Sequence, residues 1–393
     1  MLPQLHQHEW MKDEQLVAFR DQLRRYIAAE LTPKLDGWRR QGFIPREVWR
    51  PFGELGFLLP EIGEAYGGAG ATLAYQLVAQ DELARAELPA NTAVHSIASH
   101  YILDYGTEAQ KQRWLPRLVS GELLAGIALT EPGCGSDLKA LTTRARRDGD
   151  YYVIDGAKTF ITNGFSANLL VVAVRTGESG SRGVSQVVLE TENLPGFSVG
   201  RRLEKLGQHA SDTAELSFDG VRVPVDALIG GEEGRGFGQL MSQLPYERLL
   251  LAVPAAAVIE RAVELTVEYT SERKAFGHTI SDFQNTRFKL AECATIAHVV
   301  RSFVNDCVQR LLDGKLDDQA AYMAKWWCSE QQCKVVDECL QLFGGYGYMA
   351  EYPIARLYAD SRVQKIYGGA NEVMKDLIAR ELFPTHPTTK ASR

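Results

Sequence analysis

Two short segments in the middle of the chain combine glycine with residues that could contact a ligand. Residues 130–137 read Thr-Glu-Pro-Gly-Cys-Gly-Ser-Asp and follow a short apolar run. Their glycines would let backbone amides approach a ligand, because glycine has no Cβ to block them. Residues 160–164, Phe-Ile-Thr-Asn-Gly, offer an aromatic ring and a hydroxyl that could flank and hydrogen-bond a planar ring. Each segment alone is as typical of a tight turn or a hairpin end, so neither identifies a reaction.

Further candidate segments lie in the last 150 or so residues. They are Arg-Lys-Ala-Phe-Gly at 273–277, Phe-Gln at 283–284, a glycine-rich stretch at 341–347, and Ile-Tyr-Gly-Gly-Ala-Asn-Glu at 366–372. A carboxylate, Glu247, follows Pro245 by two residues. Taken alone, this pattern predicts a solvated residue in the first turn of a helix, where a negative charge favours the helix dipole.

Composition limits the class of protein. The 393 residues are enough for two or three packed units, and 45% hydrophobic with 24% charged residues is typical of globular proteins. A net charge of −7 argues against a broad grip on nucleic acid, which needs clustered Lys and Arg. The six cysteines show no C-x-x-C spacing and the histidines no H-E-x-x-H pattern, so we expect reduced thiols and no metal site.

The hydrophobic pattern changes twice along the chain. Helical spacing dominates to about residue 122, short β-rich runs such as 169–174 and 184–189 follow, and helical spacing returns after the glycine-rich stretch 230–236. These changes predict three domains, at 1–122, 123–235 and 236–393, and an α+β fold. No apolar run reaches membrane-spanning length, and the first residues lack the pattern of a secretory signal, so we expect a cytoplasmic protein without a membrane span.

Taken together, the motifs resemble the signatures of the acyl-CoA dehydrogenase family, in order and at matching intervals over almost the whole chain, most closely those of the long-chain and isovaleryl-like subgroup. The resemblance implies an N-terminal helical domain, a central β-barrel or sandwich domain and a C-terminal four-helix bundle. It also implies non-covalent FAD, a homotetramer built as a dimer of dimers, and electron-transfer flavoprotein as redox partner. The implied reaction converts an acyl-CoA to a trans-2-enoyl-CoA in the breakdown of fatty or branched-chain acyl groups.

The resemblance assigns roles by position. Phe160 stands where many relatives have Trp, which keeps an aromatic wall without the indole donor. The segments at 273–284 and 341–345 match positions that contact the cofactor of a neighbouring subunit. The implied cofactor contacts are Ile127, Leu129, Thr130, Gly135, Ser136, Phe160, Ile161, Thr162, Arg273, Phe276, Gln284, Gln341, Gly344, Gly345, Ala370 and Glu372. The implied substrate contacts are Ser136, Arg248, Tyr367 and Gly369.

The resemblance also replaces the surface interpretation of Glu247. In many relatives the catalytic base is a Glu at the position that is Gly368 here. The long-chain and isovaleryl enzymes lack that Glu as well, and they carry the base on another helix in a segment similar to residues 244–249. Glu247 is therefore the expected base, because abstraction of an α-proton needs a carboxylate within reach. The backbone N–H of Gly368 is expected to stabilise the thioester oxygen.

Several alternatives stay open at this point. The same fold serves flavin oxidases, flavin monooxygenases, a nitroalkane oxidase and a DNA-associated repair protein. The glycine at 368 and short basic clusters also allow a non-catalytic binder of acyl-CoA or nucleic acid. Both long straight and short methyl-branched acyl groups, as in an isovaleryl-type enzyme, fit the motifs. Residues 96–105 are expected to line the tail pocket, where each buried CH₂ would add about 0.8 kcal/mol of affinity.

Overall fold

The computed structural model describes residues 8–383 except 90 and 179. It divides into two compact units. The first unit spans Glu9–Gln243 and the second begins at Leu244. The predicted α+β class, with a helical region, a central sheet and a second helical region, is confirmed.

The first unit begins with helices whose starts and ends follow local sequence signals. Asp13 caps the first helix by accepting hydrogen bonds from the backbone N–H groups of Gln15 and Leu16. Thr107 and Gln110 form a reciprocal capping box at the last one. The helices are α1 (Glu14–Tyr26), α2 (Leu35–Gln41), α3 (Trp49–Glu54), α4 (Leu73–Arg85), α5 (Asn91–Tyr105) and α6 (Glu108–Val119), with a π-helical turn at Ile27–Leu31.

The central region is one hydrogen-bonded, seven-stranded sheet. Its strands are β1 (Ala125–Ala128), β2 (Arg144–Asp148), β3 (Tyr151–Thr162), β4 (Leu169–Arg175), β5 (Val184–Glu190), β6 (Phe197–Arg202) and β7 (Thr213–Pro224). The order is β1-β4-β2-β3-β7-β6, with β5 paired to β4. The two predicted β-rich runs are β4 and β5, which pair antiparallel from Leu169 opposite Glu190 to Arg175 opposite Val184.

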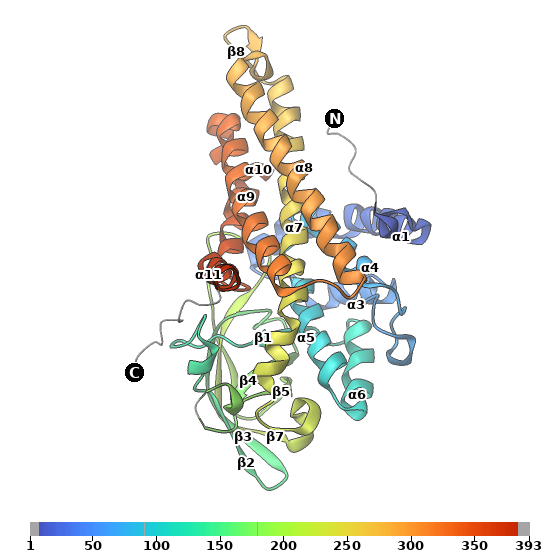
Figure 1. Cartoon of the computed structure of the whole chain (residues 1–393), viewed down its shortest axis with the longest axis vertical. Helices are drawn as coiled ribbons and strands as arrows, with labels where there is room; N and C mark the ends of the chain where they lie inside the picture. The colour runs from blue at the N-terminus through green and yellow to red at the C-terminus, as the bar shows by residue number, and fades with distance from the viewer. Residues whose placement is uncertain (1–7, 90, 179, 384–393) are drawn as a thin grey trace. The chain divides into compact units, whose positions relative to one another are not determined.

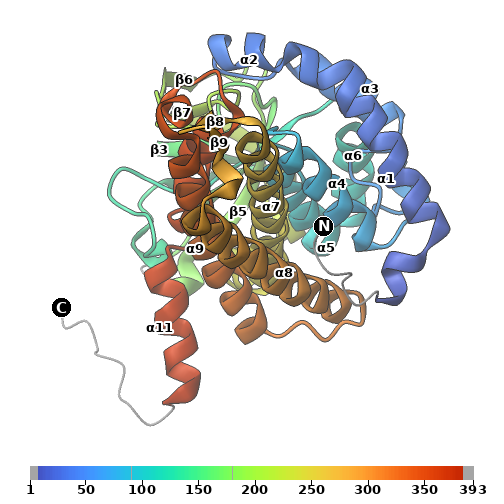
Figure 2. The same ribbon diagram turned by 90° about the horizontal axis from the view of Figure 1, so that it is seen from above.

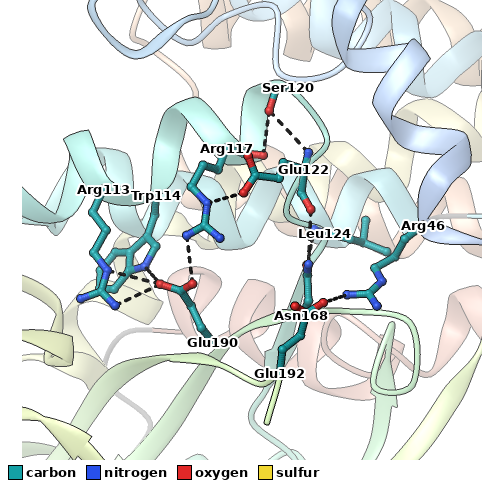
Figure 3. A network of polar contacts seen from close by, with 10 residues as sticks. All are labelled: Arg46, Arg113, Trp114, Arg117, Ser120, Glu122, Leu124, Asn168, Glu190 and Glu192. Carbon is teal, nitrogen blue, oxygen red and sulfur yellow. Dashed lines mark hydrogen bonds and ion pairs between the residues drawn. The ribbon is translucent and has the colours of Figure 1, made fainter. Parts of the chain in front are cut away.

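The helices of the first unit share a hydrophobic core with one face of the sheet, and the sheet has a further apolar cluster of its own. Leu169 and Val171 of β4 pack in the same cluster as Trp114 of α6, Leu23 of α1 and Phe52 of α3. A polar network also joins α6 to the sheet, as Figure 3 shows: Glu190 of β5 accepts hydrogen bonds from three side chains of α6. Because they share this core, the helices and the sheet belong to one compact unit, Glu9–Gln243. The domain boundaries at 122 and 235 stay a prediction.

The second unit is helical. Its helices are α7 (Gly236–Glu272, which continues from the first unit), α8 (Gln284–Leu312), α9 (Asp318–Phe343), α10 (Pro353–Ser361) and α11 (Asn371–Leu382). The three long helices run side by side, with the hairpin of β8 (Lys274–Ala275) and β9 (His278–Thr279) between α7 and α8 in the chain (Figure 1, Figure 2). All six cysteines are free, and five of them lie on α8 and α9.

A search of the described helices finds none that is long and apolar enough to cross a membrane.

Candidate active site

The loop after β1 is a tight turn closed by two backbone hydrogen bonds. Glu131 and Cys134 exchange them, with N···O distances of 2.8 and 3.1 Å. Gly133 and Gly135 are exposed, have no left-handed φ, and a Cβ on either would meet no atom within 4 Å. Nothing in the packing of the described chain requires glycine at these positions. The open backbone is instead suited to a ligand that lies against the loop.

A buried ion pair connects this loop to β3. The Nζ of Lys158 lies 2.9 Å from Glu131 Oε1 and donates to the carbonyl oxygen of Leu129 at 3.0 Å. Glu131 also accepts hydrogen bonds from Thr142 and Thr143. Burial of Glu131 would raise its pKa, but hydrogen bonds from Thr142 and the charge of Lys158 outweigh this and hold the pKa at about 2. The sequence did not predict this pair, although Glu131 lies inside one candidate motif and Lys158 stands just before another.

The end of β3 lies beside the same loop. The N–H of Thr159 donates to Thr130 O at 2.9 Å, so the predicted cofactor segments around Thr130 and Phe160 are adjacent. Phe160 is 68% exposed and has a φ of +59°. Thr162 is half-buried, whereas the side chain of Ile161 is buried in the core of the sheet. Ile161 can therefore contact a cofactor only through its backbone.

Asn163 fixes the turn that follows. Its side chain is fully buried at a φ of +61°. Its Nδ2 donates to the carbonyl oxygens of Asn91 and Ala125 at 3.1 and 3.0 Å, and its Oδ1 accepts from Asn91 Nδ2 at 2.5 Å. Asn is one of the few residues that tolerate left-handed backbone, and here it also bonds α5 to the start of β1. In the sequence, Asn163 stands out only as part of the motif at 160–164.

These residues fit a flat cofactor with polar edges. The predicted contacts Ile127, Leu129 and Thr130 are half-buried, and Gly135 and Ser136 are exposed. The surface they form offers hydroxyls, an open backbone turn and the exposed ring of Phe160. This combination suits the isoalloxazine ring of a flavin, which stacks on aromatic side chains and accepts hydrogen bonds at its edge.

In the second unit, Glu247 lies well inside α7. The helix begins at Gly236 and includes Pro245, so the expectation that Pro245 starts a helix and places Glu247 in its first turn is wrong. Proline is tolerated here although it removes one helical hydrogen bond. Glu247 is half-buried, not fully solvated.

The Gly368-Gly369 turn faces the same helix. Both glycines have left-handed φ values, +62° and +89°. A Cβ on Gly368 would lie 2.2 Å from Leu251 Cδ1. Glu247 and Leu251 are four residues apart on α7, and residues at this spacing share one face of a helix. Glu247 therefore lies one helical turn from the residue that contacts Gly368.

Arg248 and Tyr367 have buried polar atoms with no hydrogen-bond partner. Arg248 is 3% exposed, and its Cζ lies 4.3 Å from the centre of the Tyr322 ring. Its Nε and Nη1 make no hydrogen bond, and neither does the hydroxyl of Tyr367. Burial lowers the pKa of Arg248 from its usual value. Two predicted substrate contacts thus retain unused donors, which a polar ligand could satisfy.

The last predicted contacts lie in two places. Ala370 is the N-cap residue of α11, and Glu372 is exposed in its first turn, where a carboxylate favours the helix dipole. At the β8–β9 hairpin, the guanidinium of Arg273 lies 5.3 Å from the Tyr346 ring, which brings the hairpin to the end of α9. Phe276 is 93% exposed there. The neighbouring predicted contacts Gln284, Gln341, Gly344 and Gly345 are exposed as well.

Three models of the acyl-CoA dehydrogenase family match consecutive parts of the chain. The N-terminal domain matches residues 13–122, the middle domain residues 126–221 and the C-terminal domain residues 234–383. The mitochondrial long-chain specific acyl-CoA dehydrogenase of Mus musculus is 43% identical over 93% of this chain and 85% of its own length. The mitochondrial isovaleryl-CoA dehydrogenase of Oryza sativa is 33% identical over 94% of this chain and 92% of its own length.

Solved structures agree with these relatives. An acyl-CoA dehydrogenase from Geobacillus kaustophilus has a TM-score of 0.92 and 46% identity, covering 94% of this chain and 98% of that one. A glutaryl-CoA dehydrogenase from Mycobacterium smegmatis, solved in complex with FADH2, has a TM-score of 0.89 and 28% identity, covering 95% and 96%. Members of this family are FAD-dependent oxidoreductases. On this evidence the chain belongs to the acyl-CoA dehydrogenase family.

Proposed function

We propose that this protein catalyses the FAD-dependent α,β-dehydrogenation of an acyl-CoA to a trans-2-enoyl-CoA, with Glu247 as the base. FAD, when bound, would accept the β-hydrogen as hydride. The chain itself must remove the α-proton and stabilise the negative charge that develops on the thioester oxygen. Glu247 would take the proton, and the Gly368 N–H would donate to the oxygen.

The observation that carries this proposal is the contact between Gly368 and α7. The turn is left-handed, which disfavours any residue with a Cβ, and a side chain at 368 would also have to displace the end of Leu251, so this backbone favours glycine over glutamate. The carboxylate must then come from elsewhere. Glu247 lies on the same face of α7 as Leu251, one turn away, and is half-buried. A substrate against Gly368 would lie within reach of its carboxylate.

The remaining roles follow from the burial of each side chain. Arg248 would donate hydrogen bonds from its free Nε and Nη1 to oxygen atoms of the coenzyme A thioester, and Tyr367 would donate from its hydroxyl. Thr130, Ser136, Phe160 and Thr162 would hold the flavin ring and its edge. The other predicted cofactor contacts stay predictions.

We favour a long straight-chain substrate over a short branched one. The relative named for long-chain substrates is 43% identical, whereas the isovaleryl relative is 33% identical. The predicted tail-pocket residues lie on α5, and two of them, Tyr101 and Ile102, are fully buried in the apolar core. The same segment also buries the polar residues Ser96, Ser99 and His100, so the preference for a long chain rests mainly on the relatives, and an affinity that rises with chain length would support it.

We also propose that the protein acts as a homotetramer and passes electrons to electron-transfer flavoprotein. The exposed Phe276 and the turn at 344–346 are suited to contact the cofactor of another subunit, because large exposed aromatics commonly mark interfaces. This chain is similar to a solved structure described as the electron transferring flavoprotein of Acidaminococcus fermentans, with a TM-score of 0.89. The predicted cytoplasmic location stays a prediction.

The test is anaerobic reduction of the FAD-loaded protein by straight-chain and methyl-branched acyl-CoAs. The wild type should bleach with an optimum in chain length, and Glu247→Gln should bind the same acyl-CoA without bleaching. Glu268→Gln, an exposed carboxylate on the same helix, is the matched control and should bleach normally. Undiminished bleaching by Glu247→Gln would remove Glu247 as the base and make Glu372 the next candidate.

The oxidase and monooxygenase alternatives are separated by the second half of the same experiment. Admitting air to the substrate-reduced protein should restore the flavin slowly if the protein is a dehydrogenase. Rapid reoxidation with consumption of O₂ would instead favour an oxidase. Absence of bleaching with every acyl-CoA would favour the non-catalytic binder.

A further inference from the structure

The buried ammonium group of Lys325 holds the Gly368-Gly369 turn through a hydrogen bond to its backbone. Lys325 of α9 is 1% exposed. Its Nζ donates to the carbonyl oxygen of Gly369 at 2.5 Å and to Asn371 Oδ1 at 3.0 Å. Both acceptors are neutral, and in the part of the chain that the structure describes no carboxylate lies within ion-pair distance of this Nζ. The resemblance assigned no role to Lys325.

This arrangement is costly for a purely structural residue. Burial, together with the nearby charge of Arg248, lowers the pKa of Lys325 to about 8, although the charge of Glu372 acts in the opposite direction. An apolar side chain would fill the same space without desolvating a charge. The ammonium must therefore provide something that an apolar residue cannot, and the hydrogen bond to Gly369 is the contact that reaches the turn.

The turn needs support because glycine alone does not define it. Two consecutive glycines can adopt many backbone conformations, left-handed and right-handed. On one side, the N–H of Tyr367 donates to Val363 O at 3.2 Å. On the other side, the Gly369 carbonyl is held by Lys325. The direction of the Gly368 N–H, which lies between these two anchors, depends on both.

The rest of the cluster holds Asn371 instead. Ser329 donates to Asn371 Oδ1, and Asn371 Nδ2 donates to Glu330, each at 3.1 Å. Lys365 pairs with Glu330 at 2.6 Å. These contacts fix the first residue of α11, whereas Lys325 fixes both that residue and the turn before it.

We propose that Lys325 is a positioning residue that fixes the Gly368-Gly369 turn so that the Gly368 N–H points at the thioester oxygen. The inference rests on the proposed function, because it concerns the same oxygen. Lys325 acts through the backbone and does not touch the substrate. A misplacement of about 1 Å at a reacting group can slow a reaction about 100-fold without a comparable loss of binding.

The experiment reads the polarisation of the substrate carbonyl directly. FAD-loaded Glu247→Gln protein is mixed with palmitoyl-CoA labelled with ¹³C at the thioester carbon, and the carbonyl stretch is recorded by isotope-edited infrared spectroscopy. With Lys325 present, the stretch should move to lower frequency than in free palmitoyl-CoA. In Glu247→Gln/Lys325→Met the shift should fall by at least half. In the Glu247 enzyme, Lys325→Met should slow anaerobic bleaching about 100-fold and change the Kd of palmitoyl-CoA less than about threefold.

Lys365→Met is the matched control, because it removes the other ammonium of the same cluster, whose partner is Glu330. It should leave the carbonyl shift intact. FAD content and melting temperature are measured for each variant. If Lys325→Met does not retain FAD, Lys325→Gln replaces it: the shorter amide keeps a donor but cannot reach both acceptors, so an intermediate shift is expected.

The outcomes separate the two proposals. If Lys325→Met and Lys325→Gln retain FAD and show a carbonyl shift as large as that of the protein with Lys325, the role of Lys325 is overturned and the proposed function stays intact. No shift in Glu247→Gln itself shows that the thioester oxygen has no donor there, which overturns the proposed role of Gly368 and this inference with it. An equal loss in Lys365→Met would reduce Lys325 to a general structural part of the cluster.

Discussion

Each unit buries a lysine beside a turn that carries predicted site residues, but the two lysines have different partners. Lys158 pairs with the carboxylate of Glu131 and also holds the carbonyl oxygen of Leu129. Lys325 holds the carbonyl oxygen of Gly369 and an amide oxygen, both neutral. The backbone beside each lysine is left-handed, at Phe160 in one case and at Gly368 in the other.

The difference in partners predicts that one lysine contributes mainly to the stability of the fold and the other mainly to the rate of the proposed reaction. When one member of a buried ion pair is removed, the other member stays buried as an unpaired charge, and this costs a large amount of stability. When a buried charge with neutral acceptors is removed, the protein loses its hydrogen bonds but no longer has to desolvate the charge. These two effects on stability partly cancel. We therefore expect the Lys158 pair to matter mainly for folding, and Lys325 mainly for the geometry of the turn.

The largest expected effect is on the Lys158 side. Glu131→Gln leaves the ammonium of Lys158 buried without its counter-charge, and we expect a loss of about 3–5 kcal/mol in the free energy of unfolding. This loss is measured by unfolding the protein in denaturant and recording a spectroscopic signal that comes from the first unit. The double variant Glu131→Gln/Lys158→Met should be less destabilised than Glu131→Gln alone, since no charge stays unpaired. Simple addition of the two single effects would show that the pair is not coupled.

The second largest expected effect is a pH dependence of the free energy of unfolding that comes from Lys325. The pKa of Lys325 is lowered from its usual value of 10.5 to about 8 in the folded protein, so the unfolded chain binds more protons between these two pH values. The free energy of unfolding should therefore rise with pH from about 8 to 10.5 because of this residue, by up to about 3 kcal/mol. Lys325→Met lacks this contribution and compares best with the wild type below pH 8.

The measurement is the difference in melting temperature between wild type and Lys325→Met, recorded from pH 7 to 10.5. The difference should move in favour of the wild type as the pH rises. Parallel curves would mean that Lys325 titrates near its usual pKa, and the contrast with Lys158 would then lose its electrostatic basis. Arg248 and Glu372, the charges that act on Lys325, are present in both proteins.

Sequence reasoning found the elements and the motifs but not these two supports. Helical and β periodicity are local, and the runs at 169–174 and 184–189 became β4 and β5. The partners of Lys158 and Lys325 lie 27 and 44 residues away, and no spacing rule joins them. The prediction that a helix starts at Pro245 was wrong because proline is common in the first turn of helices, whereas here it lies inside α7. The burial of Ile161 was readable, because alternate residues of a strand face opposite sides.

A smaller effect comes from the left-handed glycine beside Lys325. Gly368→Ala should lower the free energy of unfolding by about 1–2 kcal/mol, because an L-residue is strained at a φ of +62°. Its Cβ must also displace the end of Leu251, which is a flexible side chain. Thermal unfolding gives the size, and Gly238→Ala, where an added Cβ meets nothing, is the control. Equal melting temperatures for both variants would show that the turn is not held in its left-handed form.

The smallest effect has the opposite sign and lies beside Lys158. Phe160 is strained at a φ of +59°, yet it is 68% exposed and so gains little from burial. Phe160→Gly should relieve the strain, and the added freedom of the unfolded chain should offset part of the gain, which leaves about 0.5 kcal/mol of stabilisation in the protein without FAD. With FAD bound the order should reverse, because the ring that would stack on the flavin is gone. Melting temperatures of both forms, with and without FAD, decide it: a variant that is more stable in both would mean that Phe160 does not contact the cofactor and that its strain has no use there.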